Sequence, residues 1–389
     1  MVGMTLAVAL ARAGIRTVVL ERGTMPSQLE ASFDGRVSAI ALGSKHIMEG
    51  IGAWQAMAPH AQPITDIRVS DGHTPVFLHY DHDEIGSEPF GYIVENRYIR
   101  YALQQAMKDM PSLMVLERNM VDSLESNEAS LTLTLKDKSQ LSCSLLVGAD
   151  GKQSSVRSLA KIDATQWGYG QTAIVCTIEH TLPHHGLAQE RFLPAGPFAV
   201  LPMTGNRSSL VWVEPDDRVQ VYLDLPEDEF VQEIVERIGD YLGTISCSGQ
   251  RFSYPLSLMH AKDYTAHRIT LIGDAAHGIH PLAGQGVNLG FRDVGVLAEL
   301  LIERFRLGLD LGGQDVLAHY QRWRMLDNVT MLAVTDNLNR IFGTSLLPVK
   351  MARILWLWTV GQIPPLKSFF MKHAMGLVGD LPDIVRKNI

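Results

Sequence analysis

Residues 268–294, RITLIGDAAHGIHPLAGQGVNLGFRDV, hold the densest group of side chains and glycines that could bind a ligand. An apolar run ends at Gly273, and the carboxylate of Asp274 follows where it could accept hydrogen bonds from a sugar hydroxyl. A Gly-Gln-Gly step then brings bare backbone to the start of a predicted helix, whose free N–H groups suit an anionic ring oxygen. Two turns between a strand and a helix would explain the glycines but not this combination.

A second candidate motif is LLVGADGKQSSVR, residues 145–157, in which a buried strand leads into Asp150 and Gly151. A carboxylate at the end of a strand can accept hydrogen bonds from a sugar or orient nearby amides, and the glycine allows close approach. Asp-Gly is also a favoured β-turn pair. The motif by itself therefore favours a ligand site and a plain turn equally.

The chain opens with MVGMTLAVALARAGIRTVVLERG, which predicts a helix of small residues, a strand over 17–20 and an acid, Glu21, at the strand end. These are the later parts of a dinucleotide-binding βαβ unit, whose fingerprint is G-x-G-x-x-G. Gly3 would be the third glycine, and we expect the first strand and the first two glycines to lie upstream of Met1. An ordinary helix start is the alternative interpretation.

Composition limits the class of protein. The chain has 389 residues, of which 46% are hydrophobic and 20% charged, so it can bury a large core in two or three domains. Its net charge of −8 argues against a nucleic-acid surface. The three cysteines have no C-x-x-C spacing and indicate neither a disulfide framework nor a zinc site, and a reducing compartment fits them best. No secretory signal is apparent and no apolar run reaches the roughly 18 residues of a spanning helix, so we expect a cytoplasmic protein.

The order of elements indicates an α/β fold, α+β overall, with two discontinuous domains. Helices and strands alternate to about residue 55, antiparallel strands are predicted over 63–93, and a helix begins at Asn96. Residues 166–260 are strand-rich, with GPFAVLPM, SSLVWVEP and QVYLDLP as strands and EDEFVQEIVERIG as the one helix. The first domain is predicted over 1–55, 90–165 and 262–345, the second over 56–89 and 166–261, and a C-terminal helical segment over 346–389.

In this order, the three motifs resemble those of the flavin-dependent aromatic hydroxylases of the para-hydroxybenzoate hydroxylase type, in which all three serve one FAD. The likeness covers nearly the whole chain. It narrows to the ubiquinone-biosynthesis branch with FDGRVSAIAL at 33–42, ERFLPAGPFAVLPM and SSLVWVEP within 190–215, and PPLKSFFMKHAMGLVGDLP at 364–382. The resemblance implies a Rossmann-like FAD domain with a mostly parallel sheet, an antiparallel-sheet substrate domain and C-terminal helices.

The resemblance also implies cofactor contacts at matching positions. Glu21, 18 residues after the third fingerprint glycine, would hold the adenosine ribose, and Arg36 would reach the pyrophosphate or the flavin edge. Asp150 with its glycine would shape a groove used by FAD and, transiently, by NAD(P)H, and residues 281–288 would line the isoalloxazine ring. The implied cofactor-binding set is Gly3, Glu21, Arg36, Asn96, Asp150, Gly151, Gly273, Asp274, Pro281, Gly284, Gln285, Gly286, Val287 and Asn288.

The implied reaction is hydroxylation of the aromatic ring of a polyprenyl phenol, with NAD(P)H and O₂ as co-substrates. NAD(P)H would reduce the flavin, O₂ would add to its C4a atom, and the ring would attack the distal oxygen of the hydroperoxide. No protein nucleophile and no metal is required, and no catalytic residue is assigned. His277 and His280 could assist a proton, although such histidines more often cap or pack turns. Trp212 and Phe198 are expected in the sheet core or the substrate wall.

The C-terminal segment differs in charge from the rest of the chain. Residues 350–389 carry six basic and two acidic residues, a net charge of +4, so the preceding 349 residues carry −12. The run ILWLWTVGQIPPL has two tryptophans and is too short and too broken by proline to span a bilayer. Such a segment suits an anionic membrane surface, here the cytoplasmic face. Helices packed on the FAD domain, or on another ubiquinone-biosynthesis protein, are the equal alternative.

Two other functions remain open from the sequence. A flavin reductase or dehydrogenase of a prenyl lipid would share the FAD motifs but need no oxygen chemistry, so an oxygen-dependent product would distinguish it. A chain without the first strand could also bind no FAD and serve as a lipid-binding or assembly subunit, which a flavin absorbance spectrum would decide. The oligomeric state is left open.

Overall fold

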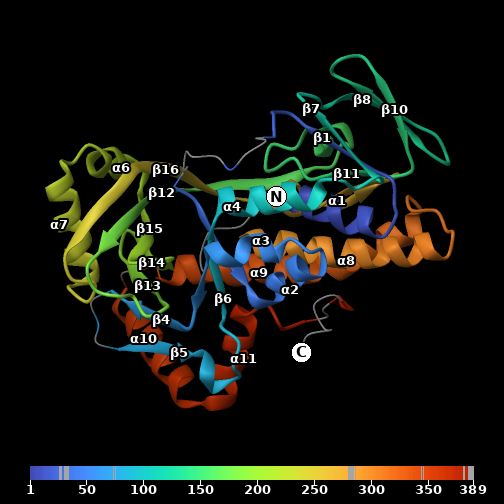
Figure 1. Ribbon diagram of the computed structural model, residues 1–389. Helices are drawn as coiled ribbons and strands as arrows, with labels where there is room; N and C mark the ends of the chain where they lie inside the picture. Colours follow the sequence, from blue (N-terminus) through green and yellow to red (C-terminus); the bar gives the residue numbers. More distant parts are fainter. Residues whose placement is uncertain are drawn as a thin grey trace.

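The computed structural model sets a large antiparallel sheet beside a group of helices and short parallel strand pairs (Figure 1). It describes residues 1–25, 29, 35–72, 74, 76–278, 284, 286–342, 344, 346–379 and 382–383. The predicted fold class, α/β and α+β overall, is confirmed by this mixture of elements. The domain boundaries stay a prediction.

Short parallel strands form the part of the molecule that carries the three motifs. The parallel pairs are β1 (Thr17–Glu21) with β7 (Leu113–Glu117) and β11 (Leu146–Gly148) with β18 (Ile269–Leu271), and β17 (Thr265–Ala266) runs antiparallel beside β18. α1 (Val2–Arg12) is small or aliphatic and buried over residues 5–11. It can therefore pack closely against β1 and against α8 (Gly286–Arg306).

Two small antiparallel sheets lie around this centre. Their strands are β2 (Val37–Ala41), β6 (Gly91–Glu95) and β3 (Ala61–Ile64) in one, and β10 (Gln140–Cys143), β9 (Leu131–Leu135) and β8 (Val121–Ser126) in the other. The shorter helices are α2 (Leu42–Gly50), α3 (Trp54–Met57), α4 (Asn96–Met107) and α5 (Ser155–Leu159), with single turns η1 (Ala58–His60), η2 (His82–Glu84) and η3 (Gly273–Ala275). α4 confirms the predicted helix, because Ile99, Leu103 and Met107 recur every four residues and are buried.

The large sheet has eight strands in the order β19-β16-β12-β15-β14-β13-β4-β5. These are β19 (His277–Gly278), β16 (Ile245–Ala261), β12 (Ala164–His180), β15 (Arg207–Pro215), β14 (Gly196–Met203), β13 (Leu187–Leu193), β4 (Asp66–Asp71) and β5 (Phe77–Asp81). Neighbouring strands are antiparallel except β13 and β4, which are parallel. The sheet therefore joins strands predicted within 63–93 to strands predicted within 166–260.

The predicted strand QVYLDLP, residues 220–226, is wrong. Its first half belongs to α6 (Asp216–Leu223), so two helices follow β15, and not one, the second being α7 (Glu227–Ile238). The first turn of α6 carries two acids, which favour the positive end of the helix dipole. Its Val219 is buried in the cluster beneath α7, so tertiary packing selects the helix over the local alternation of apolar residues.

The core beneath α7 explains two aromatic side chains of the large sheet. Phe230, Ile234 and Ile238 of α7 pack on Phe198 of β14 and Trp212 of β15, each only 1% exposed. The indole N–H of Trp212 is satisfied by a 2.7 Å hydrogen bond to Oε1 of Glu214. Both aromatics therefore lie in the sheet core, which was one of their two expected positions.

Three helices close the described chain: α9 (Gln314–Phe342), α10 (Leu347–Gln362) and α11 (Pro364–Ala374). α10 packs against β4 and β5 in the lower part of the molecule (Figure 1). Arg353 of α10 donates hydrogen bonds to both carboxylate oxygens of Asp71, at 3.0 and 3.2 Å, and both side chains are buried. Within the described residues, no helix combines the length and the apolar character needed to cross a bilayer.

Candidate functional site

The two central motifs lie side by side because their strands are parallel neighbours. Gly148 of β11 pairs with Leu271 of β18, and the N–H of Ile272 donates to the Gly148 carbonyl at 2.9 Å. Both segments then leave the carboxyl edge of the same sheet, which is where α/β folds bind ligands. Arg157 joins the two segments by donating hydrogen bonds to the carbonyls of Ala275, at 2.9 Å, and Lys152, at 2.7 Å.

The start of α1 fits between these motifs through contacts that only glycine allows. A Cβ on Gly3 would lie 2.9 Å from the Cβ of Ala149, just after β11. A Cβ on Gly290 of α8 would lie 2.7 Å from Cγ2 of Val2, and one on Gly273 would lie 3.2 Å from Cγ1 of the same valine. Gly273 also has φ +57°, a conformation that favours glycine. Gly3, the predicted third glycine of the fingerprint, thus lies where α1 closely approaches the end of β11.

Two predicted carboxylates flank the first turn of α1. Glu21, at the end of β1, and Asp274, in η3, both lie within electrostatic range of the backbone nitrogen of Met1. Glu21 accepts a 2.8 Å hydrogen bond from the N–H of Gly23 through one oxygen. Asp274 is exposed, and the described part of the chain provides no hydrogen-bond partner for its carboxylate. Both are therefore able to accept hydrogen bonds from a ligand hydroxyl.

Asp150 orients backbone amides, one of its two predicted roles. Its carboxylate accepts hydrogen bonds from the N–H groups of Ser155, at 2.7 Å, and Val156, at 3.2 Å, and from the hydroxyl of Ser154. These bonds satisfy free donors at the start of α5. Gly151 has φ +84°, and a Cβ there would meet nothing, so backbone conformation and not crowding favours glycine.

Arg36 and Asn96 are close in the structure although 60 positions separate them in sequence. The N–H of Asn96 donates to the carbonyl of Arg36 at 3.1 Å, and the hydroxyl of Ser38 donates to Oδ1 of Asn96 at 2.6 Å. Arg36 is exposed, with its guanidinium 5.6 Å from the ring centre of Tyr254. The pair of β2 and β6 therefore places the exposed cation of Arg36 beside the buried amide of Asn96.

The start of α8 is fixed to β2 by Asn288. Its amide accepts a hydrogen bond from the N–H of Ala41 at 3.0 Å and donates to the carbonyls of Ala39, at 2.8 Å, and Gly284, at 3.2 Å. Gly284 has φ +62°, and a Cβ on it would lie 2.9 Å from the Cβ of Ala39. Gly286 and Val287 open α8, whereas Pro281, Gln285 and His280 lie outside the described residues.

We expect Asn288→Ala to lower the free energy of unfolding by about 1–3 kcal/mol, because the buried N–H of Ala41 and carbonyl of Ala39 lose their partner. Chemical denaturation with and without added FAD measures the change. Asn337→Ala is the matched control, since the Asn337 amide donates to a backbone carbonyl on an exposed face of α9. Equal midpoints for the two variants would contradict the anchoring role of Asn288.

A buried charge network lies behind the late motif. Asp293 of α8 accepts hydrogen bonds from the N–H of Gly273 at 2.9 Å, from Nε of Arg324 at 2.8 Å and from the side-chain amide of Asn328 at 3.3 Å. It also contacts a His277 ring nitrogen at 2.5 Å. Burial raises the pKa of Asp293, but the charges and hydrogen bonds of His277 and Arg324 outweigh it and hold that pKa below its usual range. His277 therefore has a packing role, which was the more frequent of its two expected roles.

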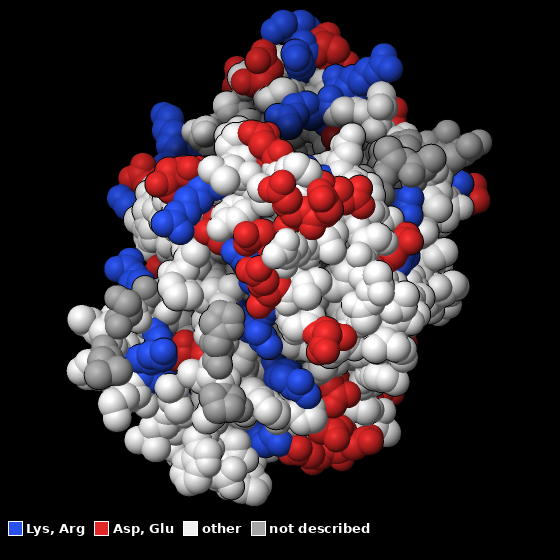
Figure 2. All heavy atoms as spheres, turned by 90° about the vertical axis from the view of Figure 1, so that its left-hand side faces the viewer, with Lys and Arg blue, Asp and Glu red and all other residues white. Residues whose placement is uncertain are grey.

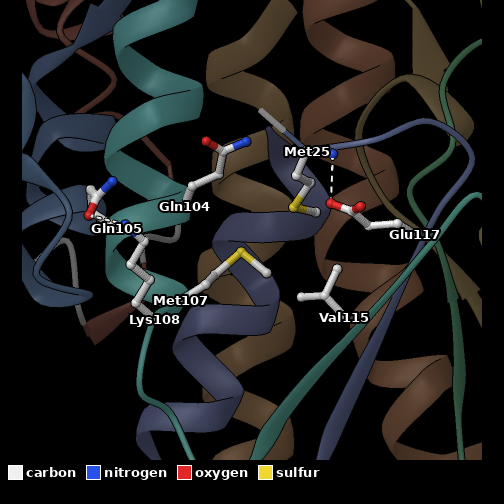
Figure 3. Close-up of a pocket in the computed structure, with 7 residues that line it drawn as sticks. All are labelled: Met25, Gln104, Gln105, Met107, Lys108, Val115 and Glu117. Carbon is white, nitrogen blue, oxygen red and sulfur yellow. Dashed lines mark hydrogen bonds between the residues drawn. The ribbon is translucent and has the colours of Figure 1, made fainter. Parts of the chain in front are cut away.

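A surface pocket of about 340 Å³ opens beside β7 and the end of α4 (Figure 3). Its lining residues are Met25, Gln104, Gln105, Met107, Lys108, Val115 and Glu117. Figure 3 shows Met25, Met107 and Val115 reaching it from three separate elements. The N–H of Met25 donates to Glu117 at 2.8 Å, and Glu117 lies opposite Glu21 in the β1–β7 pair. The pocket thus adjoins β7, the partner of β1, and Glu21 at the end of β1 is a predicted ribose-binding acid.

Comparison with known proteins connects this geometry to a family. A family model described as an FAD binding domain matches residues 1–333. Ubiquinone hydroxylase UbiL of Rhodospirillum rubrum is 48% identical over 376 residues, which cover 97% of this chain and 87% of that protein. The chain belongs to the FAD-dependent hydroxylases of ubiquinone biosynthesis. Another relative, 3-demethoxyubiquinol 3-hydroxylase of Escherichia coli, is 32% identical, with 97% of this hydroxylase and 96% of that protein covered.

A solved structure supports the fold of the hydroxylase. The crystal structure of p-nitrophenol 4-monooxygenase PnpA from Pseudomonas putida matches with a TM-score of 0.78, covering 97% of this chain and 96% of that chain. Its sequence identity is 18%, so this likeness concerns the fold alone. The predicted membership, the aromatic hydroxylase activity and the FAD cofactor are confirmed by the family match and the relatives together.

The residues where the start of α1 lies against the ends of β11 and β18 fit FAD chemically. Gly3 and Gly273 let the start of α1 pack closely against the ends of β11 and β18, Asp274 offers an unpartnered carboxylate among the described residues, and Arg36 offers an exposed cation. The assignment of each predicted residue to a particular part of the cofactor stays a prediction.

Sequence reasoning missed Arg324 as a support of the hydroxylase site. Its signal was present as Arg324, Asp327 and Asn328, a polar stripe at i, i+3 and i+4 on one face of α9.

Proposed function

We propose that this hydroxylase oxidises the aromatic ring of a polyprenyl phenol, with NAD(P)H and O₂ as co-substrates. The observation that carries the proposal is the exposed carboxylate of Asp274, surrounded by glycine-mediated contacts at the carboxyl edge of β11 and β18. The 48% identical ubiquinone hydroxylase supports the pathway. Within the ubiquinone-biosynthesis branch, the sequence most resembles 2-octaprenyl-6-methoxyphenol hydroxylase. The ring carbon that is hydroxylated stays a prediction.

Bound FAD supplies the redox chemistry, taking electrons from NAD(P)H and activating O₂. The chain supplies position. Glu21 would accept a hydrogen bond from the adenosine ribose, Asp274 would bind the ribityl or pyrophosphate region, and Arg36 would pair with the negative charge of the pyrophosphate. The positive end of the α8 dipole would stabilise negative charge on the flavin ring oxygen. His277 contacts Asp293 through a ring nitrogen, and Asp293 in turn accepts the N–H of Gly273 and so supports the η3 turn from behind.

The reaction itself tests this proposal. The purified chain, loaded with FAD, is given a short-chain prenyl phenol, NADH or NADPH, and isotopically labelled O₂. We expect one labelled oxygen atom in the product and no product under argon. Turnover of the prenyl lipid without oxygen would instead indicate a reductase or dehydrogenase. A chain that binds no flavin and forms no product would indicate an assembly or lipid-binding subunit.

The C-terminal helices offer a surface that suits a lipid-dissolved substrate. On α10, Met351, Leu355 and Trp358 are 64%, 62% and 55% exposed and recur at helical spacing, opposite the buried face that holds Arg353. Figure 2 shows broad areas without acidic or basic side chains in the lower half of the molecule, the level of α10 and β5 in Figure 1. Lys350 is exposed beside these residues. We infer that this face of α10 lies on an anionic membrane surface.

Leu355→Glu is expected to weaken binding to vesicles of mixed neutral and anionic lipids by at least about tenfold, because an exposed leucine contributes roughly 1.5–3 kcal/mol when buried. Vesicle flotation measures the bound fraction. Val221→Glu is the matched control. Val221 is also 62% exposed, but it lies on α6, outside the basic C-terminal segment. Equal losses in both variants, or no binding by the unaltered chain, would exclude α10 as the membrane face.

A further inference from the structure

Two of the three cysteines, all free thiols, lie against each other in the large sheet. Cys176 is on β12 and Cys247 on β16, and the register places Ile178 directly opposite Cys247. Side chains alternate along a strand, so Cys176 and Ile178 point to the same face, and Cys176 is a diagonal neighbour of Cys247. Both side chains contribute to the core cluster beneath α7, and each thiol shifts the pKa of the other. No local sequence pattern indicates this pair, because 71 positions separate its members.

We propose that Cys176 and Cys247 are an oxidisable thiol pair, which hydrogen peroxide converts into a disulfide between β12 and β16. The two side chains lie on the same face of adjacent strands, and the disulfide would join their sulfur atoms by a bond of about 2.05 Å. The pairing of β12 with β16 is irregular between Val175 and Thr177, next to Cys176, and Gly249 on the opposite strand has φ +87°. Such a bulge gives the backbone local freedom to accept the disulfide geometry.

The environments of the two thiols assign their roles. Cys176 is 3% exposed within the core beneath α7, whereas Cys247 is half-buried at the edge of the same cluster. The neighbouring thiol of Cys176 and the nearby charge of Arg251 lower the pKa of Cys247, although burial opposes them. The thiol of Cys247 and burial raise the pKa of Cys176. Cys247 is therefore the attacking thiolate and Cys176 the resolving thiol.

Arg251 is held where it can act on this pair. Its guanidinium stacks 3.9 Å from the ring centre of Phe230 on α7 and donates hydrogen bonds to the carbonyls of Leu223, at 3.1 Å, and Leu225, at 2.6 Å. No carboxylate is among these partners, so its positive charge is not neutralised by them. Cys143, on β10 in a different sheet, has no comparable setting, and burial raises the pKa of its thiol.

The chemistry balances in two steps. The Cys247 thiolate attacks one oxygen of hydrogen peroxide, the O–O bond breaks, and the departing hydroxide takes up a proton, which leaves a sulfenic acid and one water. The thiol of Cys176 then attacks the sulfenic sulfur, its proton leaves with the hydroxyl as a second water, and the S–S bond forms. The pair loses two electrons and two hydrogens, and an external dithiol returns them.

The test uses the full chain loaded with FAD, reduced with a dithiol, freed of it, and exposed to hydrogen peroxide at graded concentrations. Peptide mapping after blocking of free thiols is expected to recover a peptide that links Cys176 to Cys247 and disappears on renewed reduction. A maleimide is expected to modify Cys247 faster than Cys143 near neutral pH, since the pKa of Cys247 is lowered and that of Cys143 is raised. Oxidation of Cys247 to sulfinic acid without a link would overturn the proposal.

Variants separate the two roles. Cys176→Ser is expected to accumulate a sulfenic acid on Cys247 that dimedone traps, and Cys247→Ser is expected to give neither adduct nor link. Cys143→Ser is the matched control and should form the link as the unaltered chain does. A dimedone adduct on Cys176 in the Cys247→Ser variant would reverse the assigned roles and contradict the proposal. The mapping of the unaltered chain decides the question even if a variant folds poorly.

Discussion

Replacing Asp293 with alanine is expected to lower the free energy of unfolding by about 3–5 kcal/mol, because it breaks a buried ion pair and leaves the buried charge of Arg324 to Asp327, which also pairs with Arg292. Arg324 is 2% exposed and would lose its hydrogen bond to Oδ1, while His277, 1% exposed, and the N–H of Gly273 would lose Oδ2. Since Gly273 opens the η3 turn, FAD retention should fall together with stability. Urea denaturation and the flavin content of the purified chain measure both effects.

The control is Asp163→Ala, which removes an exposed ion pair with Lys262 at 3.2 Å. Exposed pairs contribute little, so its unfolding midpoint should stay near that of the unaltered chain. The pH dependence gives an independent check. A carboxylate whose folded pKa is lowered adds stability that is full above its unfolded pKa of about 4 and is lost as the pH falls toward the folded pKa. Asp293→Asn should therefore flatten the loss of stability below about pH 4, and an unchanged slope would contradict the ion pair.

Asp274→Ala is expected to raise the dissociation constant for FAD roughly ten- to a hundredfold, because a charged hydrogen bond to a ligand contributes about 1.5–3 kcal/mol. The melting temperature without FAD should change little, since Asp274 is exposed and no described residue bonds its carboxylate. Fluorescence titration of the flavin-free chain measures the affinity. Full retention of flavin by the variant would remove Asp274 from the cofactor site.

Asp150→Ala provides the opposite pattern for comparison with Asp274→Ala. Its carboxylate caps α5 through Ser155 and Val156, and loss of a cap costs about 0.5–2 kcal/mol of stability. We therefore expect a lower melting temperature without FAD and a smaller change in FAD affinity than Asp274→Ala produces. If the two variants behave alike, the exposed carboxylate has no special role in binding the cofactor.

Local sequence determined the elements and the positions of the motifs. α4 begins at the predicted Asn96 because its apolar residues recur at helical spacing. β11 ends at Gly148, two residues before Asp150, and β18 ends at Leu271, two residues before the predicted Gly273. The exception is α6, where alternating Val221 and Leu223 indicated a strand. Alternation over so few residues is compatible with both structures, and the burial of Val219 beneath α7 decided between them.

The sequence by itself therefore determined the mixed fold, the family and the strand ends at which a cofactor can bind. Only the tertiary structure decided which polar groups meet. Asp293 and Arg324 are 31 positions apart, and Ala41 and Asn288 are 247 apart, yet each pair is within hydrogen-bonding distance. Local patterns reflect propensity and burial on one element, whereas these pairings depend on how separate elements are placed against one another. The buried charges behind η3 and the thiol pair of β12 and β16 are for that reason properties of the folded chain alone.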